Sequence, residues 1–182
     1  MREEEDELRA SHLSELKCPI ARTVGAIGDP WALMILRELY LGSRRFDQFQ
    51  GQLRAPTALL SARLKELELI GIIKKQRYQA RPARYDYRLT SKGIDLWPLM
   101  IALKHWGDRW GGWAKTSPAA LRHKTCGSAT GLQFTCECCG KPLTAFEVEL
   151  EQRPPMANER HNLDALNKTR NQEKARRRRQ GP

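Results

Sequence analysis

The sequence predicts a mainly α-helical protein with one small two-stranded β hairpin, followed by a small β extension. Three observations support this fold class. Apolar residues recur three and four positions apart over much of residues 3–70 and 90–110, which is the spacing of amphipathic helices. Residues 72–89 instead hold two β-prone runs around a short turn. Four of the five cysteines fall between residues 126 and 139, in a segment that looks like short strands and tight turns.

The first three elements are predicted to be helices. Residues 3–17 are good helix formers with one weak leucine stripe, so this helix needs a partner surface. Pro19 fits the first turn of a helix over 19–27. Asp29 is placed as the N-cap of a helix over 30–41 that is apolar on most faces. Such a helix belongs in the core.

Two further helices, over 45–53 and 57–70, are joined by a tight connection. The second has leucines three and four residues apart on one face, and Thr57 is placed as its N-cap. Two helices joined by a short turn, with the second capped and basic, form a helix-turn-helix pattern.

A hairpin and a long helix follow. The strands are expected over 72–78 and 84–89, with a basic tip between them. Thr90 can cap the helix, in which Pro98 should cause a kink or mark a later start. Its apolar residues have heptad spacing: Leu96, Leu99, Leu103, Trp106 and Trp110. This stripe is either an ordinary core face or a dimer seam shared with residues 3–17.

The charge is strongly basic and unevenly distributed, with a formal net charge of +11. Residues 17–115 carry eighteen basic and eight acidic side chains, and residues 151–182 carry nine and four. Such an excess favours a polyanion as partner, nucleic acid before a membrane surface. A basic protein whose charges are only solvated is the alternative.

A membrane protein and a disulfide-rich secreted protein are both disfavoured. The longest nearly unbroken apolar stretch, Trp31 to Leu41, contains Arg37 and Glu38 and falls short of the ~20 apolar residues of a spanning helix. The first residues, MREEEDEL, are acidic where an export signal is basic and then apolar. We therefore expect a cytoplasmic protein whose cysteines are thiols or ligands.

The order of the elements is that of a winged helix-turn-helix, and four strings resemble the HxlR-type transcriptional regulators. They are CPIARTVGAIGDPWALMILREL from Cys18, RRFDQFQ from Arg44, LLSARLKELELIGII from Leu59 and YQARPARYDYRLTSKG from Tyr78. The resemblance covers about residues 18–110 and implies a homodimeric, sequence-specific DNA-binding repressor or activator without enzymatic activity. Ala58 departs from the family pattern, in which Asn often follows the capping Thr, and this removes one polar contact.

The residues predicted to bind DNA lie on the helix over 57–70 and on the hairpin, which would be the wing. They are Thr57, Ala58, Ser61, Ala62, Arg63, Lys65, Arg77, Arg81 and Arg84. Rotation of 100° per residue puts Ala58, Ala62 and Lys65 opposite the leucine face, toward the major groove. Arg81 at the wing tip is placed like a minor-groove arginine. Surface side chains that are only solvated are the alternative.

The cysteine cluster has the spacing of a structural metal site. H-x2-C-G and C-x2-C-G can each form a tight turn that presents two ligands, and thiolate with imidazole favours one tetrahedral Zn²⁺ per chain. The predicted ligands are His123, Cys126, Cys136 and Cys139. Cys138 is the expected bystander, able to replace His123, and unliganded thiols are the alternative. Short strands over 133–136 and 144–149 would flank the site, as in a zinc ribbon.

Cys18 has two interpretations. Some HxlR-type regulators use a cysteine at the matching position as a redox switch, so the resemblance makes Cys18 a redox candidate. It also lies just before a helix N-terminus, where the helix dipole favours a thiolate. A simple buried thiol is the alternative.

The sequence therefore predicts four segments and one main function. Residues 1–17 form a dimerisation helix, 18–114 a winged helix-turn-helix domain with a C-terminal dimerisation helix, 115–152 a zinc-ribbon-like extension, and 153–182 a basic disordered tail. The protein would regulate transcription in response to a small molecule or a redox signal. The alternative is a non-regulatory RNA-binding protein with a structural zinc site, although its tryptophans follow a helical stripe rather than a sheet. An enzyme is disfavoured because the acidic residues are scattered.

Overall fold

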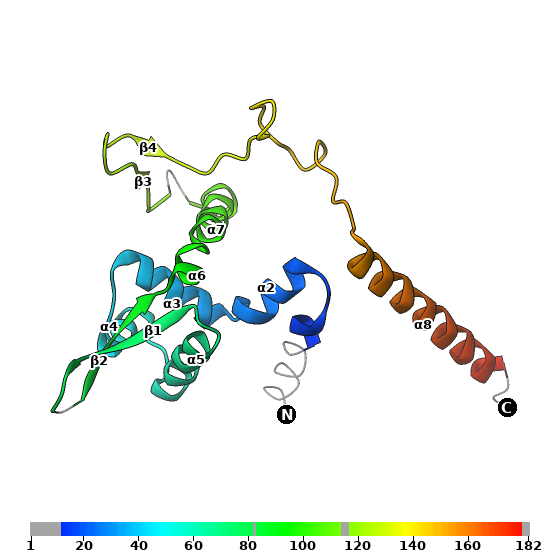
Figure 1. Cartoon of the computed structure of the whole chain (residues 1–182), viewed down its shortest axis with the longest axis horizontal. Coiled ribbons are helices and arrows are strands. Elements are labelled where there is room, and N and C mark those ends of the chain that lie inside the picture. The colour runs from blue at the N-terminus through cyan, green and yellow to red at the C-terminus, as the bar shows by residue number, and fades with distance from the viewer. Residues whose placement is uncertain (1–11, 82, 114–116, 180–182) are drawn as a thin grey trace. The chain divides into compact units, whose positions relative to one another are not determined.

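The computed structural model describes residues 12–81, 83–113 and 117–179. The chain divides into two units: one combines the residues up to Ala26 with those from Phe146 onward, and the other runs from Ile27 to Ala145. The helix-turn-helix, the wing and the cysteine cluster lie in this second unit, which we call the regulator unit (Figure 1). The boundaries and roles of the four segments predicted from the sequence remain predictions.

Helix α3 (Pro30–Leu41) begins and ends where the sequence predicts. The Asp29 carboxylate accepts hydrogen bonds from the backbone N–H groups of Trp31 and Ala32, at 2.9 and 3.0 Å. At the other end, Gly42 has a φ of 104°, a conformation that favours glycine. These caps fix the limits of the central helix of the core.

The helix-turn-helix consists of α4 (Phe46–Leu53) and α5 (Thr57–Leu69). Thr57 is not the N-cap that the sequence predicts. Pro56 occupies that position, and no side chain caps α5. The Thr57 hydroxyl instead accepts a 2.8 Å hydrogen bond from the side-chain amide of Gln50 on α4. Because the extended Pro56 places Thr57 inside the first turn, its hydroxyl joins the two helices rather than capping one.

The wing is an antiparallel hairpin of β1 (Ile73–Gln79) and β2 (Arg84–Leu89). Pairing runs from Ile73 opposite Leu89 to Gln79 opposite Arg84, with an irregularity between Arg77 and Gln79. Ile73 is buried at the base, whereas most other strand residues are exposed. The hairpin therefore extends from the helices as a projecting arm (Figure 1).

The long helix predicted after the wing is divided in two. Thr90 caps the short α6 (Ser91–Ile94) by accepting the Gly93 N–H at 3.2 Å. Helix α7 (Trp97–Trp110) then begins one residue before Pro98. Proline lacks an N–H and is tolerated only in the first turn. It therefore marks a later helix start, one of the two outcomes that the sequence allowed.

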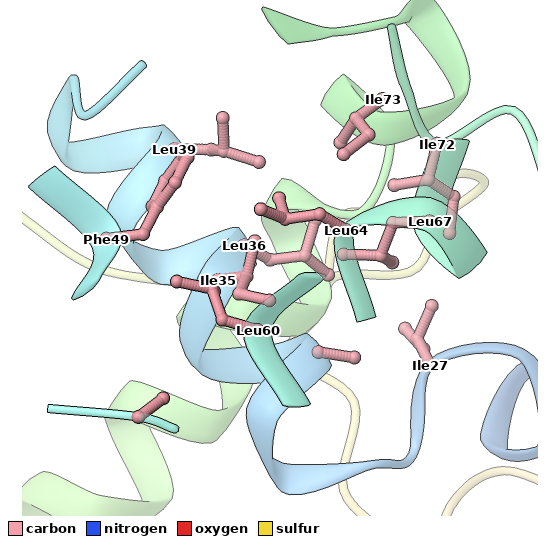
Figure 2. Close-up of a cluster of buried hydrophobic side chains, with 12 residues drawn as sticks. Ile27, Ile35, Leu36, Leu39, Phe49, Leu60, Leu64, Leu67, Ile72 and Ile73 are labelled. Atoms are coloured by element: carbon pink, nitrogen blue, oxygen red, sulfur yellow. The ribbon is translucent and has the colours of Figure 1, made fainter. Parts of the chain in front are cut away.

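The core of the regulator unit lies between α3, α5 and the start of β1 (Figure 2). Its largest fully buried side chains are Ile35, Leu36, Leu39, Phe49, Leu60, Leu64, Leu67, Ile72 and Ile73. Each such side chain contributes about 1.5–3 kcal/mol relative to an exposed position. The leucines of α5 that the sequence assigned to the inner face are all in this set.

The strands of the extension differ from the prediction. No strand forms over 144–149, and Thr135, paired with Pro142 in a single bridge, is the one paired residue of 133–136. The structure instead has β3 (Leu121–Arg122) paired with β4 (Ala129–Thr130). All of residues 117–150 are described and none is buried. Longer strands would have no core to cover, so pairing is limited to the residues beside the turns.

Outside the regulator unit lie most of α2 (Pro19–Ile27) and all of α8 (Pro154–Arg179). Residues 12–15 are helical, while residues 3–11 of the predicted first helix lie outside the described residues.

The prediction of a disordered tail over 153–182 is wrong for 154–179. Polarity argues against packing into a core, but Pro at the start followed by Ala, Glu, Lys and Arg favours a helix. The Lys17 N–H also donates to the Glu159 carboxylate at 2.8 Å.

Candidate nucleic-acid interface

The outer face of α5 is open and lies opposite the core. Leu60, Leu64 and Leu67 are buried, whereas four predicted DNA-binding residues are exposed: Ala58, Ser61, Ala62 and Lys65. Leucine spacing alone predicted this division, since residues three and four apart share a helix face. The open face carries small side chains, one hydroxyl and one ammonium group, so another surface can approach it closely.

Arg63 is engaged within the protein rather than pointing to solvent. Its guanidinium lies 3.2 Å from the Asp29 carboxylate and 2.7 Å from that of Glu66. The Arg63 side chain is only 25% exposed. This ion pair ties α5 to the N-cap of α3, so we leave Arg63 out of the proposed interface.

The three wing arginines that were predicted to bind DNA have different surroundings. Arg77 donates to backbone carbonyls of its own hairpin, to Gln79 at 3.2 Å and to Ala80. It therefore braces the tip. Arg81 and Arg84 are exposed, which leaves them suited to contact a polyanion. Pro82, between them, lies outside the described residues.

A basic and aromatic cluster that the sequence analysis did not predict lies in the outer half of the wing, beside the start of α4. The Arg45 guanidinium lies 4.8 Å from the centre of the Tyr78 ring, and the Lys75 ammonium 4.2 Å from that of Tyr85. A hollow of about 410 Å³ between the start of α4 and the wing is lined in part by Arg45, Tyr78, Arg84 and Tyr85. The two consecutive arginines before α4, Arg44 and Arg45, were the sequence signal for this cluster, but only Arg45 is exposed. Arg44 bonds to the carbonyls of Leu39 and Ser43.

Tyr87 anchors the wing to the helix-turn-helix. Its ring packs edge-on against Phe49, with 6.0 Å between centroids, and its N–H donates to the Arg44 carbonyl at 2.7 Å. Burial, followed by the Glu68 carboxylate and Tyr85, raises the pKa of the Tyr87 hydroxyl. The open face of α5 and the exposed wing arginines are therefore fixed to one core.

Comparison with known proteins assigns this arrangement to a family. Residues 26–115 match the HxlR-like helix-turn-helix family. An uncharacterised HTH-type transcriptional regulator of Mycobacterium tuberculosis is 37% identical over 135 residues, which are 74% of this chain and 85% of that protein. The chain belongs to the HxlR-like family. It is a transcriptional regulator of the helix-turn-helix type, and its relatives are regulators, a class that is generally not enzymatic.

Solved structures agree with the HxlR-like assignment. The crystal structure of PA1607, described as a candidate transcription factor, has a TM-score of 0.70 and 30% identity, and the match covers 77% of this chain and 98% of that chain. PA1374 from Pseudomonas aeruginosa, described in similar terms, has a TM-score of 0.54 and 30% identity over 75% of this chain and 93% of that one. These structures support the mainly helical fold with its small antiparallel sheet.

In this HxlR-like chain, one face of α7 carries an exposed apolar stripe. Leu103, Trp106 and Trp110 are 45%, 66% and 62% exposed, and Leu99 continues the stripe toward the helix start. Leu96, the first residue of the predicted stripe, instead packs against the core. Exposed tryptophans aligned on one face are typical of protein interfaces. None of the described helices is long and apolar enough to cross a bilayer.

The predicted metal ligands form two close pairs. His123 Nδ1 lies 3.3 Å from Cys126 Sγ, and Cys136 is hydrogen-bonded to Cys139. Hydrogen bonds from the Ser128 backbone and side chain, and then from His123, lower the pKa of Cys126 to about 7. Backbone N–H groups of Cys139 and Cys138 lower that of Cys136. Among the described residues, no three His, Cys, Asp or Glu side chains converge as a metal-binding group.

Cys18 lies directly before α2 and is half-buried. Its carbonyl accepts the Arg22 N–H at 3.1 Å, as expected for the residue that precedes a helix. The thiol is a free cysteine in the structure, like the four in the cluster.

Proposed function

We propose that this HxlR-like regulator is a dimeric, sequence-specific DNA-binding protein of the cytoplasm, with α5 in the major groove and the wing in the minor groove. The observation that carries the proposal is the open face of α5 beside an exposed basic wing on the same rigid core. B-DNA's major groove admits one α-helix, and the narrow minor groove attracts arginine.

Side-chain chemistry assigns each of these residues a role in DNA binding. Lys65 and Ser61 can hydrogen-bond base edges, while Ala58 and Ala62 allow close approach and can contact thymine methyl groups. Arg84, with Arg45 in the adjacent hollow, is placed to bind phosphates, and Arg81 to enter the minor groove. Because only two α5 side chains read bases by hydrogen bonds, the wing supplies part of the sequence preference.

The first prediction tests this division with three single variants. Lys65→Ala and Ser61→Ala should relax base preference, each by about 1–3 kcal/mol of discrimination at the base contacted. Arg81→Ala should weaken binding mainly at sites flanked by a narrow minor groove. Binding-site profiles and affinities, measured at one fixed salt concentration, test these assigned roles. Lys141→Ala removes an equal charge from the extension and should leave the profile unchanged. Unchanged profiles and affinities in all three test variants would refute the docking.

We further propose that the protein forms a homodimer through the α7 stripe together with the segment before α2. The stripe on α7 has heptad spacing and is exposed in the single chain, whereas Ile101, on another face of the same helix, is buried. A second copy can cover such a stripe, because matching heptad faces pack against each other. Two copies would then read two half-sites of an operator.

Regulation is the remaining part of the proposal: the protein responds to a small molecule or to oxidation at Cys18. The same affinity measurement, repeated after treatment with hydrogen peroxide, separates these signals. A redox sensor predicts that the wild type changes affinity by about tenfold or more, a typical coupling energy of 1–3 kcal/mol, and that Cys18→Ser does not. An equal change in both proteins, or in neither, would leave a small-molecule effector as the signal.

A further inference from the structure

The extension contains two turns with the same backbone hydrogen bonds. In the first, the His123 N–H donates to the Ser128 carbonyl at 2.9 Å and the Gly127 N–H donates to the His123 carbonyl at 2.8 Å. In the second, the Cys136 N–H donates to the Lys141 carbonyl and the Gly140 N–H donates to the Cys136 carbonyl, both at 2.8 Å. The two turns are therefore copies of one backbone design.

A glycine fixes the fold of each turn. Gly127 and Gly140 have φ values of 71° and 69°, the left-handed region that favours glycine. Each stands directly after the last side chain of its pair, Cys126 or Cys139. The turn thus places the first and fourth residues together on one side, as the 3.3 Å distance between His123 Nδ1 and Cys126 Sγ illustrates.

Backbone amides point at the sulfur atoms of both turns. The Ser128 N–H bonds to Cys126, and the N–H groups of Cys138 and Cys139 bond to Cys136. The same N–H bonds hold each sulfur in a fixed direction.

The extension also lacks the means to stay folded by itself. None of residues 117–150 is buried, and Phe134, Phe146 and Val148 are exposed. Segments of this size without a core are usually held by disulfides or a metal. The four cysteines here are free thiols in the structure, and together with His123 they offer the sulfur and nitrogen donors that a metal cross-link needs.

We propose that the two turns together bind one Zn²⁺ ion through His123 Nδ1 and the sulfur atoms of Cys126, Cys136 and Cys139. Ligand atoms at Zn–N and Zn–S distances of about 2.0 and 2.3 Å lie about 3.5 Å apart in a tetrahedron, close to the spacing of the first pair. None of the residues between the turns is buried, so packing in this segment does not prevent the second pair from meeting the first when the metal binds. Four protein ligands leave no open position, so the ion is structural.

Cys138 provides a matched control in the same turn. It occupies the third position of the second turn, is exposed, and lends its N–H to Cys136. We expect its sulfur to lie on a different side from the ligand pair, because the turn brings its first and fourth residues together. Replacement of this side chain leaves the backbone donor in place, so Cys138→Ser should keep the metal.

Native mass spectrometry of the full-length chain, purified from zinc-replete cells without chelator or acid, tests the proposal. We expect one zinc per chain in the wild type and in Cys138→Ser. Cys126→Ser, Cys136→Ser, Cys139→Ser and His123→Ala should each lose it while still binding DNA, because none of the ligands belongs to the hydrophobic core of the regulator unit. DNA binding in these variants excludes global unfolding as the cause of metal loss.

Three outcomes would overturn the proposal. One is a metal-free wild-type chain, including a chain in which Cys136 and Cys139 have formed a disulfide. Another is one zinc shared by two chains, which would place the two turns in different copies. The third is loss of zinc in the Cys138 variant with retention in the Cys136 or Cys139 variant.

Discussion

Replacing Gly93 by alanine is expected to lower the free energy of unfolding of the regulator unit by about 3 kcal/mol, at the upper end of the range for overpacking. Gly93 is buried in α6, where an added methyl group would collide with the Ile72 carbonyl oxygen and touch the Leu89 side chain. That carbonyl also accepts the Thr90 N–H at 3.0 Å. The backbone cannot move away without losing the bond that joins the wing to α6.

A second glycine supplies the control for this measurement. Gly51 lies inside α4 with nothing within 4 Å of the position that a Cβ would take. Gly51→Ala should stabilise the unit by about 0.5–1 kcal/mol, since alanine favours helices over glycine. Thermal denaturation should show a Tm lower by about 10 °C or more for Gly93→Ala. Equal Tm values for the two variants would contradict the close packing of Gly93 against the Ile72 carbonyl.

Charged replacement of Leu103 is expected to separate the dimer and to reduce affinity for a two-half-site operator by about 100-fold or more. The side chain lies in the middle of the α7 stripe and is exposed in the single chain. A lysine there places an ammonium group against its symmetry mate in a two-fold interface. Loss of the linked second half-site then removes the avidity of the pair.

Sedimentation velocity at micromolar concentration measures the first effect and DNA titration the second. Leu41→Lys is the matched control, because Leu41 is 74% exposed at the end of α3 and lies off the stripe. That variant should remain dimeric. A monomeric wild type at the same concentration would remove both the interface and the expectation of paired half-sites.

Local signals in the sequence predicted much of the regulator unit. The Asp29 cap and the glycine at 42 set the limits of α3, and leucine spacing identified the inner face of α5 and so its open face. These features depend on residues within one or two helical turns of each other. Local chemistry was therefore sufficient to orient the helix that we propose reads DNA.

Contacts between distant residues were not predictable in this way. The Arg63 pairing with Asp29 joins residues on different helices, and the Arg77 bonds depend on the irregular register of the wing. The sequence predicted both arginines to bind DNA. Whether a basic side chain is free to bind phosphate depends on tertiary neighbours, which composition does not reveal.

The predictions for the extension and the tail were wrong for a different reason. Expected strands over 144–149 assumed a core that residues 117–150 do not form. For Pro154–Arg179, low hydropathy argued against burial and was wrongly extended to argue against a helix. For residues 144–149, strands were predicted without a core for them to cover. For Pro154–Arg179, a helix was ruled out only because the segment would not pack into a core.

Selection of bound fragments from genomic DNA, followed by competition with RNA, tests the central claim most directly. The account predicts that enriched fragments share two inverted half-sites whose centres lie about 10–10.5 base pairs, or a multiple of this, apart. It also predicts that an excess of RNA displaces them poorly, because the tyrosines on the wing lie against Arg45 and Lys75 and do not form a bare aromatic sheet for stacking bases. Fragments without a shared sequence, or equal displacement by RNA, would contradict sequence-specific DNA recognition by α5 and the wing.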